Sequence, residues 1–238
     1  MTDRIAVDAI KLVLSGSVNE DITHGIDKKV QKLNKTFGML PTGWSFAKTV
    51  RYTVAGIQED PSFGFPEQLR NKPEYLCKVI DFFVADVDKI LAQIKLETKD
   101  LPLNGFTKDA MVMCENGKMI YPGVEQKAAL NGEKYNVYVH TLDAKETGIK
   151  DNTKCPFCDQ IQKGCRRVLF VQIADEKQQR ADRTRAIPLL GLHMMREHHY
   201  MPFAAEWPLE VPKLQRLFGY KNFTALRKAH TQQPAIKQ

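Results

Sequence analysis

The sequence predicts an α+β protein that is mainly helical. We expect an N-terminal helical bundle, a small antiparallel β-meander and a basic C-terminal segment rich in cysteine and histidine. Three observations lead to this prediction. Apolar residues recur with helical spacing over the first hundred positions, and short apolar runs follow them that are interrupted by Asn-Gly pairs. Beyond residue 150, cysteines, histidines and excess positive charge gather together. The predicted boundaries are 1–100, 101–150 and 151–238.

Composition places the chain among ordinary globular proteins. Of its 238 residues, 43% are hydrophobic and 26% are charged, which excludes collagen-like and low-complexity classes. No window approaches the roughly 18 consecutive apolar residues of a membrane helix, and the N-terminus lacks the pattern of a signal peptide. The five cysteines are an odd number, which favours a reducing compartment over a secreted disulfide framework. We therefore expect a cytoplasmic protein, with nuclear entry left open, and no membrane partner.

The first hundred residues predict a series of amphipathic helices. A helix is expected from Asp3 to Leu14, ended by Gly16, and a second from Asn19 to Phe37, ended by Gly38. A third should cover residues 44–57.

The strongest helix of the sequence is expected to open at Pro73, since proline suits the first helical turn. It follows a loop that is expected over residues 61–73. Its wide apolar stripe makes it the centre of the predicted bundle. Cys77, within the stripe, is interpreted as a small buried hydrophobic residue.

The middle of the chain has the pattern of β-hairpins. Asn-Gly between apolar runs is a strong hairpin signal. The pairs stand at 116–117 and 131–132, and the apolar runs at 110–114, 118–121 and 135–141. Residues 143–154 are polar and are expected to form a linker.

Charge is distributed unevenly along the chain. Residues 1–150 hold equal numbers of basic and acidic side chains, so the whole net charge of +7 belongs to residues 151–238. Such asymmetry predicts a polyanionic partner, DNA or RNA, although a solvated basic face would give the same pattern. The candidate phosphate-binding residues are Arg166, Arg167, Arg180, Arg183, Arg185, Lys213, Arg216, Lys221, Arg227 and Lys228.

Aromatic residues are interleaved with the later cations. Stacking on unpaired bases is one interpretation, and a small hydrophobic core is the favoured one. The residues are Phe203, Trp207, Phe218, Tyr220 and Phe223.

A candidate zinc site is indicated by the Cys155-Pro-Phe-Cys158 motif. Two thiolates at this spacing can reach one tetrahedral Zn²⁺. Cys165 is a candidate third ligand, and either His193 or His198 a candidate fourth. The metal would be structural. An apolar run at 168–173, expected to be a strand, lies in the sequence between the candidate cysteine ligands and the candidate histidine ligands.

Two other interpretations of the cysteine motif stay open. A Cys-x-x-Cys dithiol also occurs in glutaredoxin-like redox proteins, but there it follows a buried strand directly, whereas polar residues 150–154 precede it here. A set of free surface thiols without metal is the other interpretation.

The sequence around His198-His199-x-x-Pro202, followed by Asn222 and His230, resembles the His-Me finger (HNH) nuclease family over about 40 residues. The resemblance implies a metal-dependent endonuclease. In it His199 would be the general base, Asn222 would orient that base, and His198 and His230 would bind a divalent ion such as Mg²⁺. The sequence departs from the family at residues 211–217, which have a helical pattern where a second strand is required.

The preferred hypothesis is a zinc-stabilised protein that binds nucleic acid through its C-terminal segment. A metal-dependent endonuclease is the first alternative, so whether the chain is an enzyme stays open. A second alternative is a homo-oligomeric assembly protein of the viral or phage nucleocapsid or matrix type, whose helical bundle self-associates.

Overall fold

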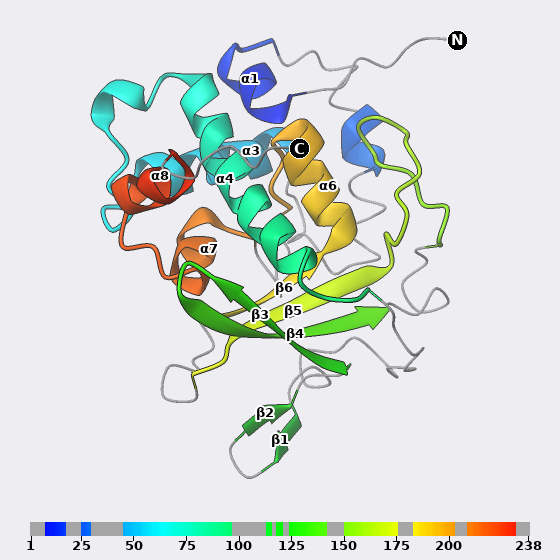
Figure 1. Ribbon diagram of the computed structural model, residues 1–238. Coiled ribbons are helices and arrows are strands. Elements are labelled where there is room, and N and C mark those ends of the chain that lie inside the picture. Colours follow the sequence, from blue (N-terminus) through cyan, green and yellow to red (C-terminus); the bar gives the residue numbers. More distant parts are fainter. Residues whose placement is uncertain are drawn as a thin grey trace.

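The structure is a computed structural model that describes residues 8–17, 25–29, 45–96, 113–115, 118–120, 124–141, 150–175, 183–202 and 209–231. Its helices lie together on one side of a four-stranded antiparallel sheet, and a small hairpin stands apart from that sheet (Figure 1). The predicted α+β class with mainly helical content is therefore confirmed. Within the described residues, no helix has the length and apolar character needed to cross a membrane.

The helices of the first hundred residues begin at capping side chains. Helix α1 (Ala9–Leu14) is capped by Asp8, and α3 (Phe46–Gln58) by Ser45. The predicted stop of the first helix is confirmed, because Gly16 has a φ of 68°, a conformation that favours glycine. Of the predicted second helix, residues 25–29 are helical, and the rest lies outside the described residues.

Helix α4 (Pro73–Leu91) is the centre of the helical layer. It begins at the predicted proline, and it contacts α1, α6, α8 and the sheet. A short 3₁₀ turn, η1 (Glu67–Leu69), precedes it within the predicted loop. The buried stripe includes Phe83, as expected, but also the fully buried acid Asp86. The carboxylate of Asp86 accepts a hydrogen bond of 2.8 Å from the Tyr220 hydroxyl and lies 3.0 Å from Nε2 of His230.

The large sheet has the strand order β3-β4-β5-β6, with antiparallel neighbours throughout. Its strands are β3 (Val124–Leu130), β4 (Glu133–Thr141), β5 (Arg167–Ile173) and β6 (Thr184–Pro188). The separate hairpin consists of β1 (Met113–Glu115) and β2 (Lys118–Ile120). The Asn-Gly pair at 131–132 turns β3 into β4, as predicted; the pair at 116–117 lies outside the described residues.

The three predicted parts of the chain contribute to one continuous hydrophobic core, and two of them share one sheet. Strands β3 and β4 come from the predicted middle part, and β5 and β6 from the C-terminal segment, yet β4 and β5 pair along their length, with Val137 opposite Val171. One hydrophobic core extends from Ala9 to Leu226. Strand pairing and core packing thus join residues that are distant in sequence. Of the expected linker, only residues 150–154 are described.

Among the described residues, three helices follow the sheet in the chain. They are α6 (Leu189–His198), α7 (Val211–Leu217) and α8 (Phe223–Thr231). The described aromatics of this region, Phe218, Tyr220 and Phe223, are buried in the core, which agrees with the favoured interpretation. Phe203 and Trp207 lie outside the described residues.

A substitution in the β3–β4 turn can test the backbone conformation alone, because a new side chain there would contact no other residue. Gly132 has a φ of 83°, and an added Cβ there meets no atom within 4 Å. We expect Gly132→Ala to lower the free energy of unfolding by about 1–2 kcal/mol, because an L-residue is disfavoured at positive φ. Urea denaturation provides the measurement. The control is Gly25→Ala, an equally open position without positive φ, which should not destabilise. Equal effects of the two substitutions would contradict the assigned turn.

Candidate metal centre

A tight turn between β4 and β5 presents the two motif cysteines. The amide of Cys155 donates to the carbonyl of Gln160 at 2.9 Å, and the amide of Asp159 donates back to the carbonyl of Cys155 at 3.0 Å. Asp159 adopts a φ of 56°, which closes the turn. The amide of Phe157 lies 3.4 Å from the Cys155 sulfur and donates to it. These contacts close the turn, and the sulfurs of Cys155 and Cys158 lie within 4.8 Å of each other.

Helix α6 supplies two histidines to the same place. Nε2 of His198 lies 3.4 Å from Sγ of Cys155, and Nε2 of His193 lies 3.5 Å from Sγ of Cys158. The four ligand atoms all lie within 4.8 Å of one another. Cys155, Cys158, His193 and His198 therefore form a Cys2His2 cluster that could hold a metal ion such as zinc.

The distances in this cluster fit tetrahedral coordination. An ion with metal–sulfur bonds of about 2.3 Å and metal–nitrogen bonds of about 2.0–2.1 Å separates sulfur from nitrogen by about 3.5 Å. Both sulfur–nitrogen distances in the cluster agree with this value. Three of the four residues are buried, and Cys158 is half-buried. Four protein ligands and little solvent are typical of a structural site.

Burial sets the protonation of the ligands. Burial raises the pKa of Cys155 to about 12, and burial together with neighbouring His198 lowers the pKa of His193. The histidine is thus neutral, the form that binds a metal. A thiolate at Cys155 needs a cation beside it, and a metal ion in the cluster would supply that charge.

Phe157, between the two cysteines, anchors the turn in the protein core. Its ring is buried and its centroid lies 4.9 Å from that of His198, 5.1 Å from that of Tyr200 and 5.9 Å from that of Phe46. Hydrophobic packing and the ligand geometry therefore hold the same turn.

Cys165, the predicted third ligand, is not brought into the cluster. Its thiol donates a hydrogen bond of 3.1 Å to the carbonyl of Lys150. The structure uses both candidate histidines in place of one histidine and a third cysteine. The physical reason is that α6 places both imidazoles beside the cysteine turn, whereas Cys165 lies buried before β5.

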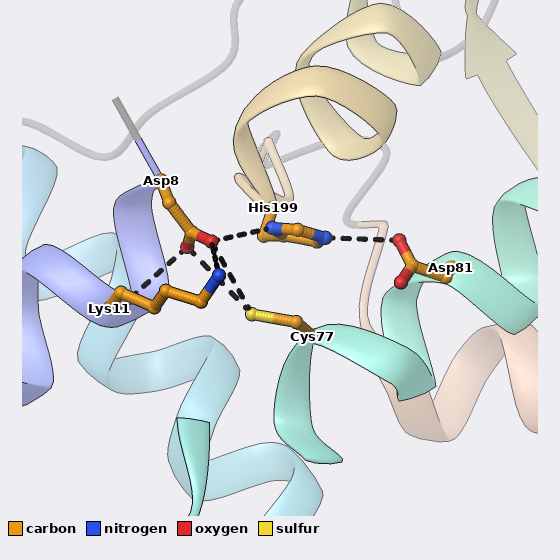
Figure 2. Close-up of polar contacts among 5 residues, drawn as sticks. All are labelled: Asp8, Lys11, Cys77, Asp81 and His199. Carbon is orange, nitrogen blue, oxygen red and sulfur yellow. Dashed lines mark hydrogen bonds and ion pairs between the residues drawn. The ribbon is translucent and has the colours of Figure 1, made fainter. Parts of the chain in front are cut away.

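The adjacent histidines His198 and His199 have different neighbours. His199 follows the end of α6 with a left-handed backbone, φ 46° and ψ 35°. Its Nδ1 lies 3.1 Å from Oδ2 of Asp8, and its Nε2 lies 3.0 Å from Oδ1 of Asp81 (Figure 2). The left-handed turn thus separates the two imidazoles.

The two carboxylates keep His199 protonated. Burial lowers its pKa, but the hydrogen bonds with Asp8 and Asp81 outweigh burial and raise the pKa to about 11. Burial raises the pKa of Asp8, and the contacts with His199 and Lys11 reverse this and hold it well below its usual range. A protonated imidazole cannot accept a proton, so this environment differs from that of the general base that the nuclease resemblance implies.

The remaining residues of the resemblance also have separate partners. Oδ1 of Asn222 accepts a hydrogen bond of 3.0 Å from the amide of Ala225 and caps α8. His230 lies against Asp86 and stacks on Phe82, with 4.6 Å between ring centroids. The structure does not gather His198, His199, Asn222 and His230 around one point.

Eight of the ten candidate phosphate-binding residues divide into two groups. The first group has protein partners: Arg166 with Asp151, Arg183 with Glu133, Arg185 with the carbonyl of Thr184, and Lys213 with Glu210. The second group is exposed on α7, α8 and the turn between them: Arg216, Lys221, Arg227 and Lys228. Arg167 is half-buried, and Arg180 lies outside the described residues.

Comparison of the chain with protein-family models, with curated proteins and with solved structures gave no match. The argument about function therefore depends on the geometry of the site and on the charge of the surface.

Proposed function

We propose that this chain is a zinc-stabilised protein that binds nucleic acid. The observation that carries the proposal is the Cys2His2 cluster, whose sulfur–nitrogen distances fit a tetrahedral ion. Mixed thiolate and imidazole ligands favour Zn²⁺ over the hard cations, which prefer oxygen. The zinc has a structural role, because all four positions are filled by protein side chains.

The exposed cations on α7 and α8 support the choice of partner. We define the basic face as Arg216, Lys221, Arg227 and Lys228. All four are exposed, and no ion pair is found for any of them among the described residues. They belong to the segment that carries the entire net positive charge of the chain. Exposed cations on neighbouring elements suit the regularly spaced phosphates of a nucleic acid.

Salt-dependent binding tests this proposal. Labelled duplex DNA, single-stranded DNA and RNA are titrated with the protein at several salt concentrations, and anisotropy is measured. Each phosphate contact contributes about 0.9 to the slope of log K against log salt for duplex DNA. Changing all four residues of the basic face to Ala should therefore weaken binding and flatten the slope by about 3–4.

A matched control replaces four exposed cations elsewhere, Arg51, Lys72, Lys78 and Lys134, with Ala. This variant should bind like the wild type if the basic face makes the contacts. Equal losses in both variants, or no binding at low salt, would overturn the proposal. Cleavage that requires Mg²⁺ and is lost in His199→Ala would instead establish the endonuclease alternative. Large oligomers in sedimentation without any affinity for nucleic acid would establish the assembly alternative.

A further inference from the structure

We propose that Asp8, Cys77 and His199 form a second metal site, of the zinc class, with a coordination position left to solvent. The proposal is independent of nucleic-acid binding. The three residues come from distant parts of the chain: the cap of α1, the first half of α4 and the residue after α6. Figure 2 shows their polar ends directed toward one another.

The donor atoms have the spacing of ligands around one ion. One oxygen, one sulfur and one nitrogen lie within 4.8 Å of one another. Nδ1 of His199 lies 3.1 Å from the Asp8 carboxylate, and Sγ of Cys77 lies 3.8 Å from both Asp8 oxygens. Tetrahedral coordination requires about 3.3 Å for nitrogen to oxygen and about 3.5 Å for sulfur to oxygen. A shift of a few tenths of an ångström would complete the geometry.

Asp81 occupies the position of an outer-shell partner. Metal-binding histidines usually donate the N–H of their other ring nitrogen to a carboxylate, which fixes the ring. Here Nε2 of His199 lies 3.0 Å from Oδ1 of Asp81, while Nδ1 faces Asp8 and Cys77. The ring is thus already oriented with one nitrogen toward the candidate ligands.

The second site differs from the Cys2His2 cluster in ligand number and access. It offers three protein ligands instead of four, and Asp8 and His199 are both half-buried. Three protein ligands with an open position are typical of sites where an ion exchanges or meets a further ligand. A cation already lies there: Nζ of Lys11 is 3.0 Å from Oδ2 of Asp8, on a side chain that is 58% exposed. An ion would displace this ammonium group and the proton on Nδ1 of His199.

Cobalt titration tests the second site. The 238-residue protein, purified with zinc in its first site, is titrated with Co²⁺ in mildly alkaline buffer, and absorption and metal content are recorded. We expect one further equivalent of metal with a thiolate-to-cobalt charge-transfer band, while the zinc content stays constant. Cys77→Ser and His199→Gln should each abolish the band and the second equivalent. Cys165→Ser, which changes a buried cysteine outside both clusters, should keep both.

Two further variants examine the neighbouring charges. Asp81→Asn should weaken cobalt binding by about 10–100-fold while retaining the band at saturation. Lys11→Gln should strengthen binding, because it removes the competing cation. A second equivalent that binds equally well to Cys77→Ser, or that gives no thiolate band, would overturn the proposal. If the protein bound no second equivalent of cobalt, the proposal of a second metal site would also be overturned. The result of the nucleic-acid titration would not be affected, because the two proposals are independent.

Discussion

Cys155→Ser is expected to yield a protein without its first metal ion and with a markedly lower Tm. The substitution replaces a buried thiolate with a hydroxyl and leaves three ligands at a site that requires four. A ligand present at about 1,000 times its dissociation constant stabilises the folded state by about 4 kcal/mol. For a chain of this length, that loss corresponds to a fall in Tm of about 8–16 °C. Metal analysis and thermal unfolding provide the two measurements.

Cys165→Ser is the matched control for this experiment. Cys165 is also fully buried, but its thiol donates to the carbonyl of Lys150. The control should keep its metal and unfold near the wild type, since Ser can donate the same hydrogen bond. Chelation of the wild type should reproduce the Tm of Cys155→Ser. Loss of the metal in both variants would show that Cys165 is a ligand, and retention in both would remove the case for the Cys2His2 site.

Phe157→Ala is expected to cost about 3–5 kcal/mol of unfolding free energy while the metal stays bound. The ring is 2% exposed and packs between Phe46, Tyr200 and His198. Its removal leaves a cavity at the junction of the cysteine turn, α3 and α6. Urea denaturation gives the free energy, and metal analysis of the folded variant gives the occupancy.

Ile161→Ala is the control within the same turn. Ile161 is 55% exposed, so its truncation should change the free energy of unfolding by less than about 0.5 kcal/mol. A similar loss of unfolding free energy in both variants would mean that the effect of truncation does not depend on whether the side chain is buried. A loss of metal in Phe157→Ala would show that packing of the ring is required for the ligand geometry.

The elements that sequence predicts well are those whose signals are local. The apolar stripe and the opening proline predicted α4 with its first residue at Pro73. Residues 211–217 were predicted helical and form α7 with the same bounds. The Asn-Gly pair at 131–132 predicted the turn from β3 to β4. In each case, the residues that determine the structure are neighbours in the chain.

What sequence could not predict depends on tertiary contacts. Cys165 lies near the cysteine motif in sequence, which made it a reasonable candidate ligand. The cluster contains His193 and His198 instead, because the position of α6 brings both imidazoles to the cysteine turn. Asp81 and Asp8 are ordinary surface acids in the sequence, and their role beside His199 appears only when α1, α4 and α6 meet. The buried Asp86 interrupts an apolar stripe without any sequence signal of its partners Tyr220 and His230.

A metal ion in the Cys2His2 cluster would also change the connectivity of the chain. A metal ion held by Cys158 and His193 closes a loop that contains the 34 residues between them, including β5 and β6. Tension applied to the two ends of the protein would bypass this loop and run through the metal–ligand bonds. Strands β5 and β6 would therefore be shielded from a pull along the chain until both cysteine bonds or both histidine bonds to the ion ruptured, so a bound ion would set the mechanical resistance of the β5–β6 half of the sheet.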